Sequence, residues 1–129
     1  MFGLKVEHIV SINRCFAQYA GIEQVVVYGS RAKGNYKNGS DVDLTVIGNL
    51  DYSGLLKLEN QLDDLLLPYK IDISLHHQIN DPDLLKHIQR VGKVFYQKEK
   101  PTQRVAEPIS EYKPSNQDLP SVKNFKKKT

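Results

Sequence analysis

Cysteine is nearly absent from this sequence, and long apolar stretches are missing altogether. Cys15 is the only cysteine in 129 residues, so no intrachain disulfide can form and nothing demands an oxidising compartment. No apolar run approaches the roughly 20 residues needed to cross a membrane. The N-terminus also lacks the basic flank, apolar centre and small-residue cleavage site of a secretory leader. These absences predict a cytoplasmic protein in which Cys15 is a small buried hydrophobe.

An excess of charge is likewise missing from most of the chain. Residues 1–98 carry 11 basic and 11 acidic side chains, so the net charge of +3 lies wholly in residues 99–129. This balance argues against direct nucleic-acid binding by the first 98 residues. We expect one domain over residues 1–98, followed by a proline-rich, basic tail over residues 99–129 that is disordered or extended. Its final run, Lys126–Lys128, is interpreted as a solvated end, while contact with RNA, a membrane or an acidic partner stays open.

The most informative stretch is Val25–Ile47, which reads VVVYGSRAKGNYKNGSDVDLTVI. Asp41 and Asp43 are two residues apart, so in a strand they point to the same face, roughly 6.5–7 Å apart along the backbone. Neighbouring carboxylates repel, and a divalent cation between them relieves that repulsion. Upstream, Gly29 allows close approach of a ligand to the backbone, and exposed N–H groups at Ser30 can hold phosphate. Phosphate and carboxylate-held metal together indicate nucleotide chemistry.

The pattern Gly29-Ser30, ten residues, then Asp41-x-Asp43 resembles the motif of the polymerase-beta-type nucleotidyltransferase superfamily. Within it, the short chain and the wording GSRAKG…SDVDL resemble the minimal nucleotidyltransferases, antitoxins that adenylylate or mask a HEPN ribonuclease toxin. The resemblance covers about Val6–Gln97, and its specific part is confined to residues 29–43 and a later IDIS. It implies an α/β fold with a small mixed sheet flanked by helices.

The resemblance also implies roles for individual residues. Gly29 and Ser30 would hold the β- and γ-phosphates of ATP, and Asp41 and Asp43 would each ligate Mg²⁺. Asp72, on the strand next to the Asp-x-Asp strand, would complete a site for two Mg²⁺ ions and orient or deprotonate the incoming hydroxyl. Further contacts to the nucleotide are expected from Arg31, Lys33 and Ser40. The implied reaction transfers AMP from ATP to a hydroxyl of a HEPN-domain partner protein.

Several of these residues have plainer interpretations. Arg31 and Lys33 fit solvated surface charges about as well as phosphate ligands, and Lys33 stands where arginine is common in the family. Asp72 also fits an edge aspartate that faces water. The four histidines are interpreted as surface or loop residues, since an adjacent pair on opposite faces makes a poor chelate: His8, His76, His77 and His87.

Two other functions stay open. The first is an antibiotic-type nucleotidyltransferase that acts on a small molecule, although such enzymes usually carry an added helical domain. The second is a catalytically idle module that neutralises its partner by contact alone. The presence of all three carboxylates favours the enzyme over this second alternative.

Hydrophobic periodicity, together with the residues that start and stop helices, predicts the elements that carry these residues. Helices are expected over Val6–Tyr19, over Tyr52–Leu67 with Asp51 or Ser53 as its cap, and from the start signal Asn80–Asp83 to about Arg90. Ser30 is expected to cap a short helix. Strands are expected over Gln24–Tyr28, Asp41–Ile47, Tyr69–Leu75 and Val94–Tyr96, with Val42, Leu44 and Val46 on the face opposite the aspartates.

Overall fold

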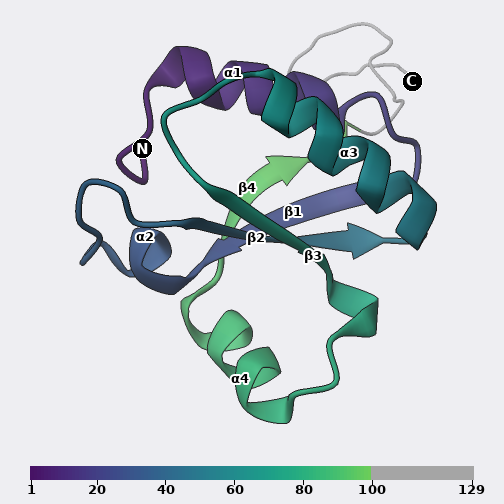
Figure 1. Ribbon diagram of the computed structural model, residues 1–129. Helices are drawn as coiled ribbons and strands as arrows, with labels where there is room; N and C mark the ends of the chain where they lie inside the picture. The colour runs from purple at the N-terminus through teal and green to yellow at the C-terminus, as the bar shows by residue number, and fades with distance from the viewer. Residues whose placement is uncertain (100–129) are drawn as a thin grey trace, which may run out of the picture. The chain divides into compact units, whose positions relative to one another are not determined.

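Four strands form one mixed sheet in the computed structural model, which describes residues 1–99 (Figure 1). The strands are β1 (Ile22–Tyr28), β2 (Val42–Gly48), β3 (Ile71–Leu75) and β4 (Lys93–Gln97). Their order is β3-β2-β1-β4, in which β1 runs antiparallel to β2 and β4 while β2 and β3 are parallel. The predicted α/β fold with a small mixed sheet is therefore confirmed.

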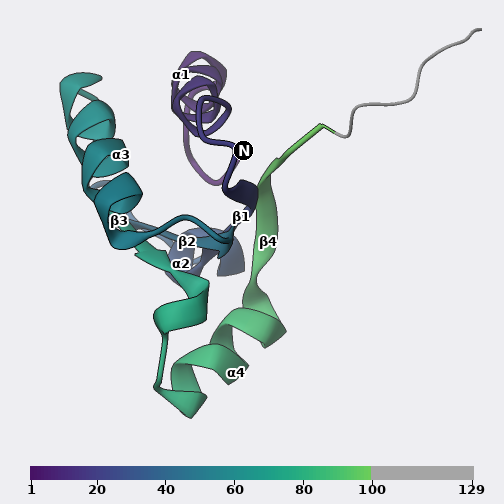
Figure 2. The same ribbon diagram turned by 90° about the vertical axis from the view of Figure 1, so that its right-hand side faces the viewer.

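Helices cover both faces of this sheet. They are α1 (Val6–Phe16), α2 (Gly29–Lys33), α3 (Tyr52–Asp64) and α4 (Pro82–Val91), with a 3₁₀ turn η1 (His76–Gln78) after β3. Figure 2 shows α1 and α3 on one side of the sheet and α4 on the other. None of the helices in residues 1–99 has the length and apolar character that crossing a membrane requires.

The core lies between the sheet and the α1/α3 layer. Val42, Leu44 and Val46 of β2 are at most 1% exposed, as the predicted alternation requires. They pack with Ile12 and Phe16 of α1 and with core residues of β1 and α3. Full burial of each such side chain contributes about 1.5–3 kcal/mol. This packing holds β2 in the register that presents its polar residues on the opposite face.

Cys15 belongs to the same core and is 6% exposed. Desolvation by burial raises the pKa of its thiol, so the reactive thiolate is disfavoured. The prediction of a small buried hydrophobe is confirmed.

Two helices end earlier than predicted. The first ends at Phe16 and not at Tyr19, because the next turn tightens into i→i−3 hydrogen bonds from the Gln18 and Tyr19 amides. The second ends at Asp64 and not at Leu67, because Leu66 takes a left-handed φ of 53°.

The caps predicted for α3 and α4 are confirmed, and the cap predicted for α2 is wrong. Asp51 caps α3 by accepting from the Gly54 amide, and Asp81 caps α4 by accepting from the Asp83 amide. The prediction for Ser30 is wrong, because α2 begins at Gly29, Tyr28 occupies the cap position, and Ser30 lies inside the helix.

Two predicted strands also start too early. The second begins at Val42, so Asp41 immediately precedes it, and the third begins at Ile71, where pairing with Val42 starts. The basic tail predicted for residues 99–129 lies, apart from Glu99, outside the described residues and stays a prediction.

Candidate active site

Two carboxylates stand on neighbouring strands at one end of the sheet. Asp43 of β2 and Asp72 of β3 are register partners in the parallel ladder. Asp72 is exposed and Asp43 is partly buried, while Asp41 is exposed one residue before β2. The parallel register therefore brings together two of the three predicted carboxylates and leaves the third at the mouth of the same strand.

Gly29 packs against one of these carboxylates. Tyr28, the last residue of β1, is the antiparallel partner of Asp43, and Gly29 follows it with a φ of +73°. A Cβ at position 29 would overlap Asp43 Oδ2 and lie 3.3 Å from Asp43 Cγ. Position 29 thus requires glycine both for its left-handed backbone and for the space that the carboxylate occupies.

The electrostatics of Asp43 reflect this crowding. Burial raises the pKa of its carboxyl group, the charges of Asp72 and Asp41 raise the pKa further, and His87 opposes them. Asp41 and Asp72 are therefore both close enough to act on the Asp43 carboxylate. A cation beside them would offset this repulsion, and carboxylate oxygens are the donors that Mg²⁺ prefers.

The three carboxylates do not form a complete metal-binding group in this structure. Among residues 1–99, no three His, Cys, Asp or Glu side chains converge as a group that could hold a metal ion. The chemistry of the donor set fits magnesium, but the metal-binding role of Asp41, Asp43 and Asp72 stays a prediction.

Two aromatic residues that the sequence analysis missed border the carboxylates. The Tyr28 ring meets the His87 ring edge-on at a centroid distance of 6.2 Å, which links the end of β1 to α4. Burial raises the pKa of the Tyr28 hydroxyl, a hydrogen bond with Ser74 lowers it, and the charges of Asp43 and Asp72 raise it. His87, interpreted from the sequence as a surface or loop residue, is partly exposed on α4 and packs its ring onto Tyr28. Tyr28 had a local signal, since it directly precedes Gly29, whereas His87 had none.

A pair of hydroxyl side chains continues the site along the sheet. Ser74 Oγ of β3 donates to Thr45 Oγ1 of β2 at 3.1 Å, one step along the face from Asp43 and Asp72. Thr45 is fully buried, so this bond satisfies its hydroxyl oxygen. Ser74 and Thr45 thus form a hydrogen-bonded pair on the same face of the sheet as Asp43 and Asp72.

Arg31, predicted to contact phosphate, is directed elsewhere. It is 3% exposed, so the surface-charge interpretation is also wrong. Its Nε donates to the Ser40 carbonyl oxygen at 3.0 Å, and its Nη1 donates to the Phe2 carbonyl oxygen at 2.9 Å. The guanidinium also lies over the Tyr36 and Tyr69 rings, 5.1 and 5.4 Å from their centroids. Through these contacts Arg31 has a structural role, because it connects α2 to Ser40 and to Phe2.

The other two predicted nucleotide contacts lie on either side of Arg31. Lys33 is exposed at the C-terminal end of α2 and is free to approach phosphate or solvent. Ser40 closes the connector between α2 and β2, because its Oγ accepts from the Lys37 amide at 2.8 Å. Their contacts with a nucleotide stay predictions.

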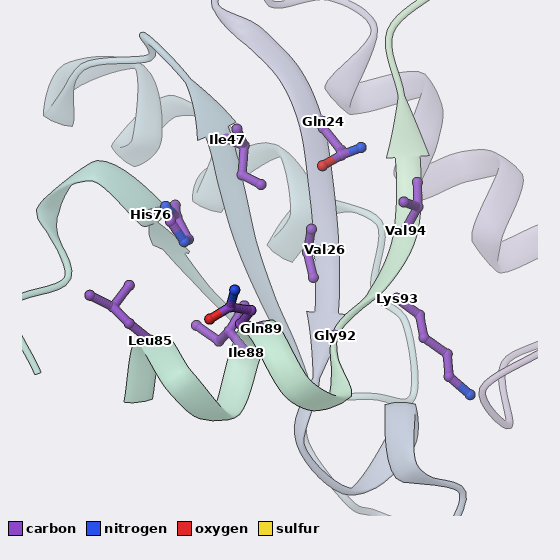
Figure 3. A pocket seen from close by; sticks show the side chains of 10 residues that line it. All are labelled: Gln24, Val26, Ile47, His76, Leu85, Ile88, Gln89, Gly92, Lys93 and Val94. Carbon is purple, nitrogen blue, oxygen red and sulfur yellow. The ribbon is translucent and has the colours of Figure 1, made fainter. Parts of the chain in front are cut away.

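An apolar pocket of about 580 Å³ lies between the sheet and α4 (Figure 3). Val26 and Ile47, two of its lining residues, project from the face of the sheet that carries Asp43. Its walls include Val26 of β1, Ile47 of β2, and Leu85 and Ile88 of α4. Tyr28 pairs with Asp43, and Val26 precedes Tyr28 by two residues. The pocket therefore begins one step along the strand from the acidic cluster, which comprises Asp41, Asp43 and Asp72. The acidic end of this face therefore adjoins an apolar hollow under α4.

A protein-family model matches most of the described chain. The model, described as "Polymerase beta, Nucleotidyltransferase", aligns with residues 11–101. That span contains Gly29, Ser30 and all three carboxylates.

Two relatives are similar in sequence. A Methanocaldococcus jannaschii protein provisionally named protein adenylyltransferase MJ0604 is 31% identical over 64 residues, which cover 49% of this chain and 61% of that protein. A Haemophilus influenzae protein provisionally named protein adenylyltransferase MntA is 28% identical over 103 residues, which cover 78% of this chain and 90% of that protein. The chain therefore matches less than two thirds of the length of the first relative.

Solved structures share the fold. A toxin–antitoxin complex with AMP-PNP contains a chain that is 19% identical, with a TM-score of 0.57 and coverage of 74% of this chain and 76% of that one. A complex of tri-AMPylated Shewanella oneidensis HEPN toxin with MNT antitoxin contains a chain that is 18% identical, with a TM-score of 0.52 and coverage of 76% and 74%. At these identities, the likeness shows the fold alone.

Proposed function

Because the chain belongs to the polymerase beta nucleotidyltransferase family, we propose that it transfers AMP from ATP to a hydroxyl group of a partner protein. The observation that carries this proposal is the register of Asp43 with Asp72 directly beside Gly29. This places two carboxylates next to a backbone corner that has no side chain of its own. A triphosphate and its counter-ions fit that combination better than an uncharged ligand does.

The chain's own residues divide the work as follows. The backbone amides of Gly29 and Ser30 would hold the terminal phosphates of ATP, and Asp41 and Asp43 would hold Mg²⁺. Asp72 orients the acceptor hydroxyl and accepts its proton. The acceptor oxygen bonds to the α-phosphorus while the bond from that phosphorus to the pyrophosphate oxygen breaks. Magnesium, when bound, supplies positive charge for the attacking and leaving oxygens of this in-line displacement.

We propose that the acceptor is a HEPN-domain toxin and that the chain acts as its antitoxin in the cytoplasm. Two observations support this. The relatives carry the name protein adenylyltransferase, and one structure with this fold contains a tri-AMPylated HEPN toxin.

The experiment is intact-mass measurement of a HEPN-domain partner encoded beside this protein, incubated with the full chain, ATP and Mg²⁺. We expect a gain of one or more adenylyl units, which disappears with Asp43→Asn. No gain in the presence of the wild-type chain would overturn the proposed transfer.

Asp41→Asn distinguishes the idle antitoxin module from the enzyme. Loss of partner neutralisation in this variant supports transfer as the mechanism. Neutralisation that survives it, without any mass gain, would favour contact alone. AMP transfer to an aminoglycoside and not to the protein would favour the antibiotic-type enzyme.

A further inference from the structure

Arg31 lies in the Gly-Ser-Arg motif, yet its side chain is buried. Only 3% of the residue is exposed, so little of the charged group is open to solvent. Among residues 1–99, no carboxylate lies within ion-pair distance of it. A buried cation without an acidic partner is expensive, so the contacts that hold it must serve a purpose that a neutral side chain cannot.

Those contacts join three separate parts of the chain. The residue belongs to α2, Nε donates to the carbonyl oxygen of Ser40 at the end of the connector, and Nη1 donates to the carbonyl oxygen of Phe2 near the N-terminus. Tyr36 of the connector and Tyr69 before β3 lie against the guanidinium plane. A planar guanidinium can satisfy two divergent carbonyls and lie over two rings at once, whereas a lysine ammonium cannot.

The Ser40 contact fixes the backbone of the neighbouring aspartate. Ser40 is held by Arg31 on one side of Asp41, and on the other side the Val42 amide donates to the Lys70 carbonyl oxygen at 2.8 Å. Asp41 is therefore the exposed residue between two anchored neighbours. Since Arg31 also follows Ser30 directly, it ties the Gly29-Ser30 corner to the end of the connector that delivers Asp41.

We propose that Arg31 is a positioning residue that sets the place of Asp41 relative to the Gly29-Ser30 corner. This rests on the proposed function, in which Asp41 holds magnesium against a phosphate bound at that corner. Groups that orient metal ligands commonly change metal affinity by about 10–100-fold when they are lost. The effect of Arg31 should therefore appear in the magnesium requirement.

A substitution in the N-terminal turn can disturb the contacts of Arg31 without changing Arg31 itself. The residues concerned form the arginine cluster: Arg31, Phe2, Tyr36, Ser40 and Tyr69. Gly3 has a φ of +76°, and a Cβ there would lie 2.7 Å from Tyr36 Cζ and 2.8 Å from Arg31 Nη1. Gly3→Ala thus disturbs the arginine cluster without removing the guanidinium and without touching the carboxylates.

The test uses the full chain with Arg31→Lys, Arg31→Met and Gly3→Ala, and with Arg14→Met as the control for an exposed arginine on α1. The first readout is ATP binding at increasing Mg²⁺ concentration. We expect both Arg31 variants to raise the half-saturating Mg²⁺ concentration about 10–100-fold. Gly3→Ala should shift it less in the same direction, and Arg14→Met should leave it unchanged. If Arg31→Lys keeps the wild-type requirement while Arg31→Met weakens ATP binding at every Mg²⁺ concentration, Arg31 acts as a simple phosphate ligand and the proposal is wrong.

The second readout does not depend on nucleotide binding. Hydrogen exchange over residues 36–42 should accelerate in Arg31→Lys, Arg31→Met and Gly3→Ala but not in Arg14→Met, while the residues of α3 keep their protection. Unchanged exchange over residues 36–42 in the three cluster variants would overturn the positioning role. If the wild-type chain binds no ATP even with the HEPN-domain partner present, the proposed function fails, and the exchange comparison still decides what Arg31 does.

Discussion

Gly29 lies against the Asp43 carboxylate, which leaves no room for a side chain at position 29. A Cβ on Gly29 would overlap the Asp43 carboxylate at Oδ2, and the φ of +73° at Gly29 is left-handed as well. The end of β1 is therefore shaped around the carboxylate that β2 presents. This contact links the Gly29-Ser30 corner to Asp43 without any intervening side chain.

Gly29→Ala should abolish magnesium-dependent ATP binding, because the added methyl group must displace the Asp43 carboxylate. Gly34→Ala is the matched control: Gly34 has a φ of +88°, but a Cβ there meets no atom within 4 Å. Both variants should lose about 1–2 kcal/mol of unfolding free energy through the left-handed backbone. Chemical denaturation and calorimetry separate the two effects, and equal ATP binding by both variants would contradict the crowding of Asp43.

Asp43→Asn should stabilise the metal-free protein at pH 7. The folded-state pKa of Asp43 is raised above the ordinary value of 3.8 by burial, Asp72 and Asp41. The protonated form is thus the one that the fold favours, and its contribution is lost as the pH rises through the folded pKa.

Thermal melts in EDTA between pH 3 and pH 7 provide the measurement. The advantage of Asp43→Asn over wild type should be greatest at pH 7 and shrink as the pH falls below the folded pKa towards 3.8. Asp63→Asn, at an exposed position on α3, serves as the control. A wild-type protein that melts above Asp43→Asn at pH 7 would show that the carboxylate is stabilised and not crowded.

Asp51→Ala should destabilise the fold without affecting the site. Its Oδ1 accepts from the Gly54 amide at 2.8 Å at the start of α3, and loss of such a cap typically costs about 1 kcal/mol. In a domain of this size, that corresponds to a fall in Tm of roughly 4–8 °C. Asp51→Ser should retain much of the cap. A loss of ATP binding beyond the loss of stability would mean that α3 influences the carboxylates.

Cys15 should resist thiol reagents in the folded protein. The residue is buried in the core, and burial raises the pKa of its thiol. Labelling with a disulfide reagent should be slow in buffer and should accelerate sharply above the unfolding midpoint in urea. Rapid labelling of the native protein would place Cys15 outside the core.

The sequence predicted what depends on local pattern. Alternation along β2 correctly separated Asp43 from the buried Val42 and Leu44, and the cap signals at Asp51 and Asp81 marked real helix starts. Helix ends were harder, because the turn after Phe16 and the left-handed Leu66 leave no strong local signal.

Long-range relationships were beyond local reasoning. The position of Asp72 beside Asp43 was expected only from the family resemblance, because strand register is set by tertiary packing. The partners of Arg31 lie between 29 residues before it and 38 residues after it, so its burial could not be predicted from the motif. The contact between Tyr28 and His87 likewise spans most of the domain.

The proposed activity requires that Asp41, Asp43 and Asp72 form a magnesium-dependent nucleotide site together with the Gly29-Ser30 corner. Calorimetry of ATP binding tests it most directly, with and without Mg²⁺, on wild type and on Asp41→Asn/Asp43→Asn, each alone and with the HEPN-domain partner present. We expect that the wild type binds ATP only with magnesium and that the double variant does not bind ATP. Equal binding by both proteins, or no magnesium-dependent binding by the wild type even with the partner, would contradict it.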